Sequence, residues 1–276
     1  MPDRITPLID RVVYAARAAK ATAAEPYEGF ERTLERVLEV RDRYRPSWRY
    51  ETVPDFEQRV HQLVGARWPC EERHQFHEVW RATLDDLAAG GLQVGRGTFA
   101  GWDDADARLA GVTWCLARHL RPDRVVETGV ARGVTTRVTL EALGRNGHGR
   151  LWSIDLPPLL ERALSDETGA AVPPRLYERW SLLRGSSRRL LPSLVANVGQ
   201  IDLFLHDSMH TTRNLEFELS QVWPAMSPGG AALIDDVDKN VATGRFLQAH
   251  PTTQAAVSWS DDGKALIACL IKPSEA

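Results

Sequence analysis

Apolar residues recur at helical spacing through residues 1–100 of the chain. Residues three or four positions apart share one face of an α-helix, so this pattern predicts a series of amphipathic helices. The predicted faces are formed by Leu8, Val12, Ala15 and Ala19; by Phe30, Leu34, Val37 and Leu38; by Phe56, Val60 and Leu63; and by Phe76, Trp80, Leu84 and Leu87. A glycine-rich stretch, AAGGLQVGRGTFAGW, follows the last of them. We therefore predict a helical N-terminal extension over residues 1–100 and a second domain over residues 101–276.

The pattern changes after residue 103, where short apolar runs alternate with helical patterns. A helix through Leu109, Val112, Leu116 and Leu120 is followed by the runs RVVETG, RLWSID, WSLLRG, IDLFLHD and GGAALIDD, with helical patterns at 134–143 and about 212–223. This alternation predicts βαβ units and a parallel, Rossmann-like α/β sheet. Near the end, QAAVSWS and KALIACLIK flank the turn signal DDG, which predicts a hairpin with an antiparallel last strand.

Composition narrows the class of protein. A net charge of −3 argues against a nucleic-acid or anionic-membrane partner, and no apolar run is long enough to span a bilayer. The N-terminus lacks the unbroken apolar stretch of a signal peptide. Cys70, Cys115 and Cys269 are far apart and show no CxxC-type metal spacing. We therefore expect reduced thiols, a cytoplasmic protein and no zinc cluster.

The stretch VVETGVARGVTT reads as a strand, a tight turn and the start of a helix. Gly129 and Gly133 allow positive φ and a close approach of backbone to a ligand, and the N–H groups of the following helix favour anionic groups. A dinucleotide fingerprint requires G-x-G-x-x-G, whereas this loop is G-x-x-x-G with Ala131 at its centre. Glycine turns also close βα units merely for packing, so this loop leaves the ligand open.

The next two strands end in residues suited to a nucleoside. Asp155 closes the run LWSID, where a carboxylate can accept hydrogen bonds from both ribose hydroxyls. Gly185 and Ser186 close the following run and form a small polar turn that can border an adenine. The alternative for Asp155 is a helix N-cap or a surface acid. Since ligands of open α/β sheets bind at the carboxyl ends of the strands, we expect these residues to gather at one edge.

With these motifs, residues 103–272 resemble the class I S-adenosylmethionine-dependent methyltransferases. In that family the first strand ends in an acid and a glycine loop, as Glu127, Gly129 and Gly133 do here, and the second ends in a ribose-binding acid, matching Asp155. The family's sheet also closes with an antiparallel seventh strand, which NAD-type Rossmann domains lack. The stretch RPDRVVETGVARGVTT…LWSIDLP…RGSSRRLLPSL…IDLFLHDSMH…PGGAALIDD looks like a bacterial subgroup with sugar and natural-product O-methyltransferases.

The resemblance implies S-adenosylmethionine as cofactor, held by Glu127, Gly129, Gly133, Asp155, Gly185 and Ser186. Arg132 is expected to face solvent or to meet the methionyl carboxylate.

Acidic residues follow the fourth and fifth predicted strands. Asp207 ends FLHD, and Asp235 and Asp236 end LIDD. Adjacent strands would bring these carboxylates together, where they repel one another unless a cation is present, and oxygen ligands select a hard ion such as Mg²⁺. The arrangement is similar to divalent-metal-dependent O-methyltransferases. The alternative is that Asp236 or Asp238 caps a helix and a single acid touches the ligand.

His210 is the candidate general base, because an imidazole accepts protons near neutral pH and Asp207 is three positions away. The alternative is a solvent-facing histidine in the first turn of a helix. His206, inside the strand, is expected to be a hydrogen-bonded core residue.

The expected activity is methyl transfer to a hydroxyl of a small-molecule acceptor, a sugar or natural product, with Asp207 and His210 catalytic. Alternatives are a metal-free methyltransferase with His210 as base, a catalytically silent assembly module and an NAD-type oxidoreductase. The segment carrying Arg175, Tyr177 and Arg179 is either a lid or a scaffold helix, and the N-terminal helices either cover the cleft or form a homo-oligomer interface.

Overall fold

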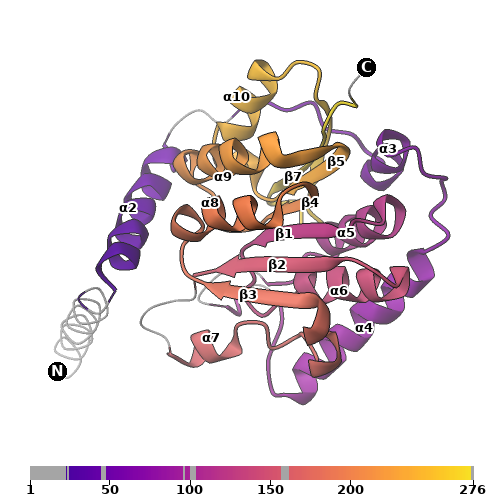
Figure 1. Ribbon diagram of the computed structural model, residues 1–276, viewed down its shortest axis with the longest axis horizontal. Helices are drawn as coiled ribbons and strands as arrows, with labels where there is room; N and C mark the ends of the chain where they lie inside the picture. Colours follow the sequence, from indigo (N-terminus) through magenta and orange to yellow (C-terminus); the bar gives the residue numbers. More distant parts are fainter. Residues whose placement is uncertain are drawn as a thin grey trace, which may run out of the picture.

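The computed structural model describes residues 23, 25–44, 48–95, 97–99, 104–156 and 162–274. The first predicted helical face, with Leu8 and Val12, lies outside them. The described residues contain a seven-stranded sheet of order β3-β2-β1-β4-β5-β7-β6 (Figure 1). Its strands are β1 (Arg124–Thr128), β2 (Arg150–Asp155), β3 (Trp180–Arg184), β4 (Ile201–His206), β5 (Met226–Ile234), β6 (Gln254–Trp259) and β7 (Leu266–Ile271).

Strands β1 to β5 pair in parallel, whereas β7 runs antiparallel to both β5 and β6. The predicted Rossmann-like sheet with an antiparallel last strand is therefore confirmed. The hairpin turns where DDG predicted it, and Gly263 supplies the positive φ of 70° that the turn requires.

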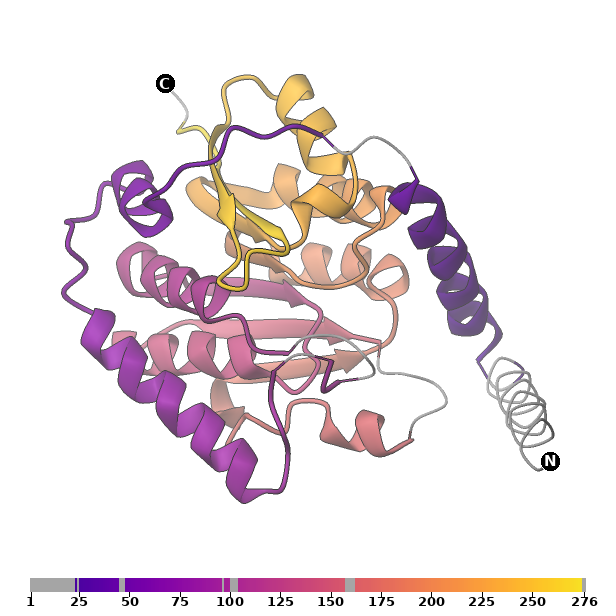
Figure 2. The same cartoon turned by 180° about the vertical axis from the view of Figure 1, so that it is seen from behind.

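Helices cover both faces of the sheet (Figures 1 and 2). They are α2 (Pro26–Arg43), α3 (Phe56–Leu63), α4 (Arg73–Ala89), α5 (Ala107–Leu120), α6 (Val134–Asn146), α7 (Arg162–Glu167), α8 (Ser187–Val198), α9 (Thr212–Ala225) and α10 (Ala242–Ala249), with the 3₁₀ turns η1 (Pro174–Arg179) and η2 (Val237–Lys239). Successive residues of a strand point to opposite faces. Val125 thus belongs to the core with α5 and α6, and Val126 to the core with α8 and α9.

Helices α3 and α4 share a core with the sheet. Phe56 and Val60 of α3 and Phe76 and Val79 of α4 are buried in the same cluster as α5. The predicted boundary near residue 100 stays a prediction. None of the described helices has both the length and the hydropathy to cross a membrane.

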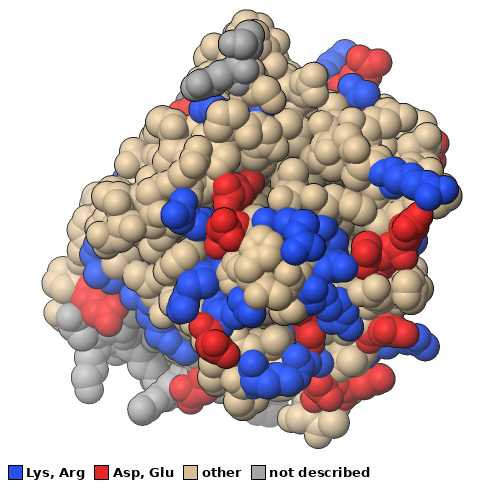
Figure 3. Space-filling model, turned by 45° about the vertical axis from the view of Figure 1, so that its right-hand side comes forward, with Lys and Arg blue, Asp and Glu red and all other residues tan. Residues whose placement is uncertain are grey.

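Helix α2 differs from the expectation. Phe30 and Val37, placed on its buried face by the periodicity, are each 61% exposed, and the residues that are buried include Glu28, Glu31 and Glu35. The predicted buried face is therefore wrong for Phe30 and Val37, because polar partners at the edge of the sheet select the acidic side of the helix, whereas Leu38 is buried as predicted. On the side of the molecule seen in Figure 3, basic and acidic side chains lie among one another, in keeping with the small net charge.

Candidate active site at the carboxyl edge of the sheet

Backbone hydrogen bonds continue between the loops just beyond the strands. Gly129 N donates to Ile154 O (2.9 Å), Asp207 N to Thr128 O (2.8 Å) and Asp235 N to His206 O (3.0 Å). Gly185 N likewise donates to Asp155 O (2.8 Å). This ladder brings the predicted residues of five strand ends to one edge.

The two loop glycines are required by close packing. Gly129 has φ of 89°, and a Cβ there would overlap the carbonyl oxygen of Asp207. Gly133, the N-cap of α6, has φ of 81°, and its Cβ would lie 3.1 Å from the Cα of Gly169. Ala131 also takes a left-handed conformation, with φ of 49°, which costs a residue with a side chain about 1 kcal/mol or more. The loop therefore turns tightly enough to bring β1 and the start of α6 against their neighbours.

Arg132 neither faces solvent nor is free for a ligand carboxylate. Its side chain is 6% exposed and forms ion pairs of 2.8 Å with both Asp104 and Glu167. It also donates to the carbonyl of Thr98 (3.1 Å). Both alternatives for Arg132 are therefore wrong: a buried guanidinium requires such partners, and here it ties the segment before α5 to the glycine loop.

Glu127 is buried at the end of β1. Its Oε2 accepts hydrogen bonds from Ser153 Oγ (2.6 Å) and Thr136 Oγ1 (2.9 Å), so the carboxyl group connects β2 and α6. Burial, with a smaller contribution from the charge of Asp155, raises the pKa of Glu127 to about 7.

Asp155 has one engaged oxygen and one without a partner. Its Oδ1 accepts from Val130 N (3.0 Å), whereas Oδ2 is buried and makes no hydrogen bond within the described residues. Burial raises the pKa of Asp155, although the N–H groups of Val130 and Ala131 oppose this effect. A buried carboxylate oxygen without a partner is costly, so this atom is suited to a ligand hydroxyl.

The acids after β4 and β5 meet His210. Ligand atoms of Asp207, His210 and Asp235 all lie within 4.8 Å of one another. His210 Nε2 is 3.8 Å from Asp207 Oδ1 and 3.6 Å from Asp236 Oδ2. Asn240, which the sequence reasoning missed, fixes this loop by donating to the carbonyl of His210 (3.1 Å). A polar residue five positions after Asp235 is a weak signal by itself.

The close carboxylates perturb one another. Burial, then the charge of Asp236, raises the pKa of Asp207 well above its ordinary value. Since the Asp207 side chain is 42% exposed, solvent moderates the burial effect, and we consider carboxylate repulsion the firmer cause. Burial and Asp207 raise the pKa of Asp235 in the same direction. Burial lowers the pKa of His210, which favours its neutral ring.

Comparison with known proteins shows what the part of the chain around this edge is similar to. Residues 126–237 match a family model described as a methyltransferase domain. The sheet that carries this edge has the Rossmann-like methyltransferase fold. A comparison with curated proteins finds no match.

Solved structures share this fold. One is a proposed O-methyltransferase from Klebsiella pneumoniae, with 17% identity, 80% of this chain and 98% of that chain covered and a TM-score of 0.54. Another is the O-methyltransferase TomG from Streptomyces achromogenes in complex with S-adenosylmethionine, with 15% identity, coverage of 71% and 90% and a TM-score of 0.53. A third is an O-methyltransferase from Bacillus cereus bound to S-adenosylhomocysteine, with 14% identity, coverage of 78% and 96% and a TM-score of 0.52.

Helix α2 lies across the turn after β3, a contact that the sequence did not indicate. Glu28 Oε2 accepts from Ser186 N (3.1 Å), at the Gly185–Ser186 turn predicted to border the adenine, and Glu28 also pairs with Arg189. Asp42 accepts from Thr212 N (2.7 Å) at the start of α9. Carboxylates are favoured at helix N-termini, where N–H groups lack intrahelical partners. Figure 1 shows α2 on the side toward which β1, β2 and β3 point.

Two other expectations concern a residue inside β4 and the segment before β3. His206 is a buried core residue as predicted, with Nδ1 2.7 Å from Oε2 of Glu218. Arg179 donates to the carbonyls of Gly147 and Gly149 (3.1 and 3.2 Å), beside the start of β2, and Arg175 pairs with Glu141 of α6. These contacts support the scaffold alternative over a lid for the segment that carries Arg175 and Arg179.

Proposed function

We propose that the domain transfers a methyl group from S-adenosylmethionine to a hydroxyl oxygen of a small molecule, a sugar or natural product. The observation that carries this proposal is the pairing of two features at one edge. Asp155 offers a buried oxygen that has no partner in the described part of the chain, and the cluster of Asp207, His210 and Asp235 begins two strands away. The first feature suits a ribose, and the second suits deprotonation of an acceptor.

The cofactor would be held by Glu127, the Gly129–Gly133 loop, Asp155 and the Gly185–Ser186 turn. The fit rests on chemistry present in the chain. Asp155 Oδ2 accepts a hydroxyl, and Glu127, when ionised, attracts a cationic ligand. The bound sulfonium would supply the electrophilic methyl group. The protein's own contribution is to orient the acceptor and exclude water.

His210 would remove the proton from the acceptor hydroxyl. Its lowered pKa favours the neutral imidazole ring, and Asp207 and Asp236, 3.8 and 3.6 Å from Nε2, stabilise the cation formed by proton uptake.

A divalent ion, Mg²⁺, would be held by Asp207, Asp235 and Asp236. The proximity of Asp207 and Asp235 and their raised pKa values support this assignment, because a cation relieves the repulsion between carboxylates. Such an ion lowers the pKa of a coordinated hydroxyl. The contact of Asp236 with His210 favours the second candidate, a metal-free methyltransferase with His210 as the sole base.

The N-terminal extension would cover the edge where the cofactor binds and would also form the interface with a second copy of the chain. The buried acids of α2 support a role in covering the edge where the cofactor binds. Its outward face carries Tyr27, Phe30, Val37 and Tyr44, which are 46%, 61%, 61% and 87% exposed. An exposed apolar stripe of this kind fits a second copy of the chain, since both copies present the same surface.

Calorimetric titration tests the cofactor. We expect binding of S-adenosylmethionine and not of NAD, and Asp155→Asn should weaken it about 10- to 100-fold, the cost of losing a charged hydrogen bond. Asp166→Asn, an exposed acid of α7, is the matched control. Tight NAD binding without S-adenosylmethionine binding would contradict the proposal in favour of an oxidoreductase.

Methyl transfer to a panel of hydroxylated compounds tests the chemistry. His210→Ala should lower kcat about 100-fold or more and alter its pH profile, while cofactor affinity stays the same. Chelation should abolish turnover, and Mg²⁺ should restore it. Full activity in excess chelator would exclude the metal-assisted mechanism and support the metal-free mechanism with His210 as base. Cofactor binding without turnover of any compound, together with copurification of a partner protein, would favour a silent assembly module.

A further inference from the structure

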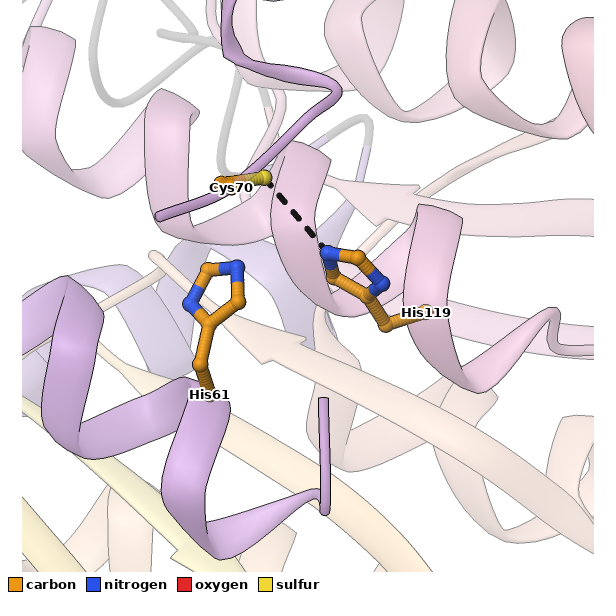
Figure 4. Close-up of side chains that lie close together, drawn as sticks. All are labelled: His61, Cys70 and His119. Atoms are coloured by element: carbon orange, nitrogen blue, oxygen red, sulfur yellow. Dashed lines mark hydrogen bonds between the residues drawn. The ribbon is translucent and has the colours of Figure 1, made fainter. Parts of the chain in front are cut away.

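Two histidines and two cysteines meet far from the acidic edge. His61 comes from α3, Cys70 from the loop before α4, and Cys115 and His119 from adjacent turns of α5. Ligand atoms of His61, Cys70 and His119 lie within 4.8 Å of one another, and Figure 4 shows both rings beside the Cys70 sulfur. Cys70 Sγ is 3.5 Å from His119 Nε2 and 3.6 Å from Cys115 Sγ. Cys70 and Cys115, which are far apart in the sequence, therefore meet in the fold.

The orientation of His61 points to a ligand. Its side chain is fully buried, and Nδ1 lies 2.7 Å from the carbonyl oxygen of Glu57, to which it donates. Nε2 then carries the lone pair, and it is buried without a hydrogen-bond partner among the described residues. Metal-binding histidines show the same arrangement, one ring N–H donated to a carbonyl and the other nitrogen turned to the ion.

The spacing of the donors matches tetrahedral zinc. Zn–S bonds of about 2.3 Å and Zn–N bonds of about 2.0 Å place sulfurs about 3.8 Å apart and sulfur about 3.5 Å from nitrogen. The Cys70–Cys115 and Cys70–His119 distances, 3.6 and 3.5 Å, are close to these values, and the donor atoms of His61, Cys70 and His119 all lie within 4.8 Å of one another. Thiolate and imidazole are the donors that zinc prefers, whereas magnesium and calcium require oxygen.

We infer that His61, Cys70 and His119 bind one zinc ion that fastens α3 and the following loop to α5, and that Cys115, whose sulfur contacts that of Cys70, turns to complete the set of four ligands. His61, Cys70 and Cys115 are buried and His119 is half-buried, and such enclosure is typical of a structural rather than a catalytic site. His119 lies near the end of α5, shortly before β1 begins, so the cluster is at the edge opposite Asp207 and Asp235. Figure 1 shows α3 and α2 on opposite sides of the molecule.

Metal content and cobalt spectra of the purified chain test this inference. We expect about one zinc per chain, and substitution by Co²⁺ should produce the sulfur-to-cobalt charge-transfer band that oxygen ligands do not give. Cys70→Ser and His119→Gln should reduce zinc content about tenfold or more. Cys269→Ser, at a buried cysteine of β7, is the matched control and should keep it. Asp207→Asn with Asp235→Asn should also keep the sulfur band, which separates this site from the proposed active site.

Chelation provides a measurement that does not depend on variant folding. Slow zinc removal from the wild-type chain should lower Tm, and Zn²⁺ should restore it whether or not methyl transfer is detected. Absence of zinc and of the cobalt band after metal loading under reducing conditions would overturn the inference. Zinc retained by both Cys70→Ser and His119→Gln, or a Cys70–Cys115 disulfide in the freshly isolated chain, would also overturn it.

Discussion

At the scale of single residues, the buried acids are the groups most sensitive to pH. Glu127 has a pKa of about 7 in the fold against 4.5 for the free side chain. Between these values the folded state retains a proton that the unfolded state has lost, so Glu127 makes stability fall as pH rises from 4.5 to about 7.

Glu127→Gln should remove this dependence while keeping an acceptor for Ser153 and Thr136. Denaturant titration gives the free energy of unfolding of wild type and variant at each pH. We expect the difference between them, wild type minus variant, to fall by about 3 kcal/mol between pH 4.5 and pH 8. Glu178→Gln, at an exposed position, should show no such change. Parallel pH profiles for wild type and Glu127→Gln would refute the burial argument.

At the scale of elements, α2 is held by charge rather than by apolar packing. Glu31 and Glu35 pair with Arg213 at the start of α9, and Glu35 also accepts from the hydroxyl of Thr211. Replacing both acids leaves Arg213 without its carboxylate partners. Each charged hydrogen bond that is lost should cost about 1–3 kcal/mol of the free energy that holds α2 on the domain.

Glu31→Gln with Glu35→Gln should therefore release α2 from the domain. We expect protease cleavage within α2 to rise about tenfold or more and bound cofactor to dissociate faster. Glu39→Gln, which affects only the exposed pair with Arg43, serves as control. Unchanged cleavage and unchanged cofactor release in the double variant would exclude the capping role.

At the scale of the whole molecule, the apolar stripe of α2 predicts self-association. Light scattering should give the mass of a dimer, and Phe30→Glu with Val37→Glu should give the 30.8 kDa monomer, because two buried charges oppose the interface. Trp259→Glu, at a residue 47% exposed on β6, should leave the dimer intact. A wild-type monomer at high concentration would contradict this prediction.

The order of elements could be predicted from the sequence because its signals are local. Alternating apolar runs, the glycine turn at Gly129 and the DDG hairpin depend on neighbours within a few positions. The parallel pairing of the strands then brings Asp155, Asp207 and Asp235 to one edge, so much of the candidate site followed from strand order alone. Helices α8 and α10 were not predicted. Helix α8 is 12 residues long and contains Pro192, a residue that usually interrupts a helix.

Other features depended on contacts between distant segments, which no local pattern encodes. Glu35 lies 176 positions from Thr211, so only the folded chain decides that the acidic face of α2 is buried and Phe30 is exposed. Arg132 is buried because Asp104 and Glu167 surround it. Cys70 and Cys115 are 45 positions apart and meet only because the loop after α3 packs on α5. Local periodicity thus determined the sheet and the edge that carries the candidate site, whereas tertiary packing decided which polar groups found partners, because a buried charge or thiol is stabilised by whatever the fold places beside it.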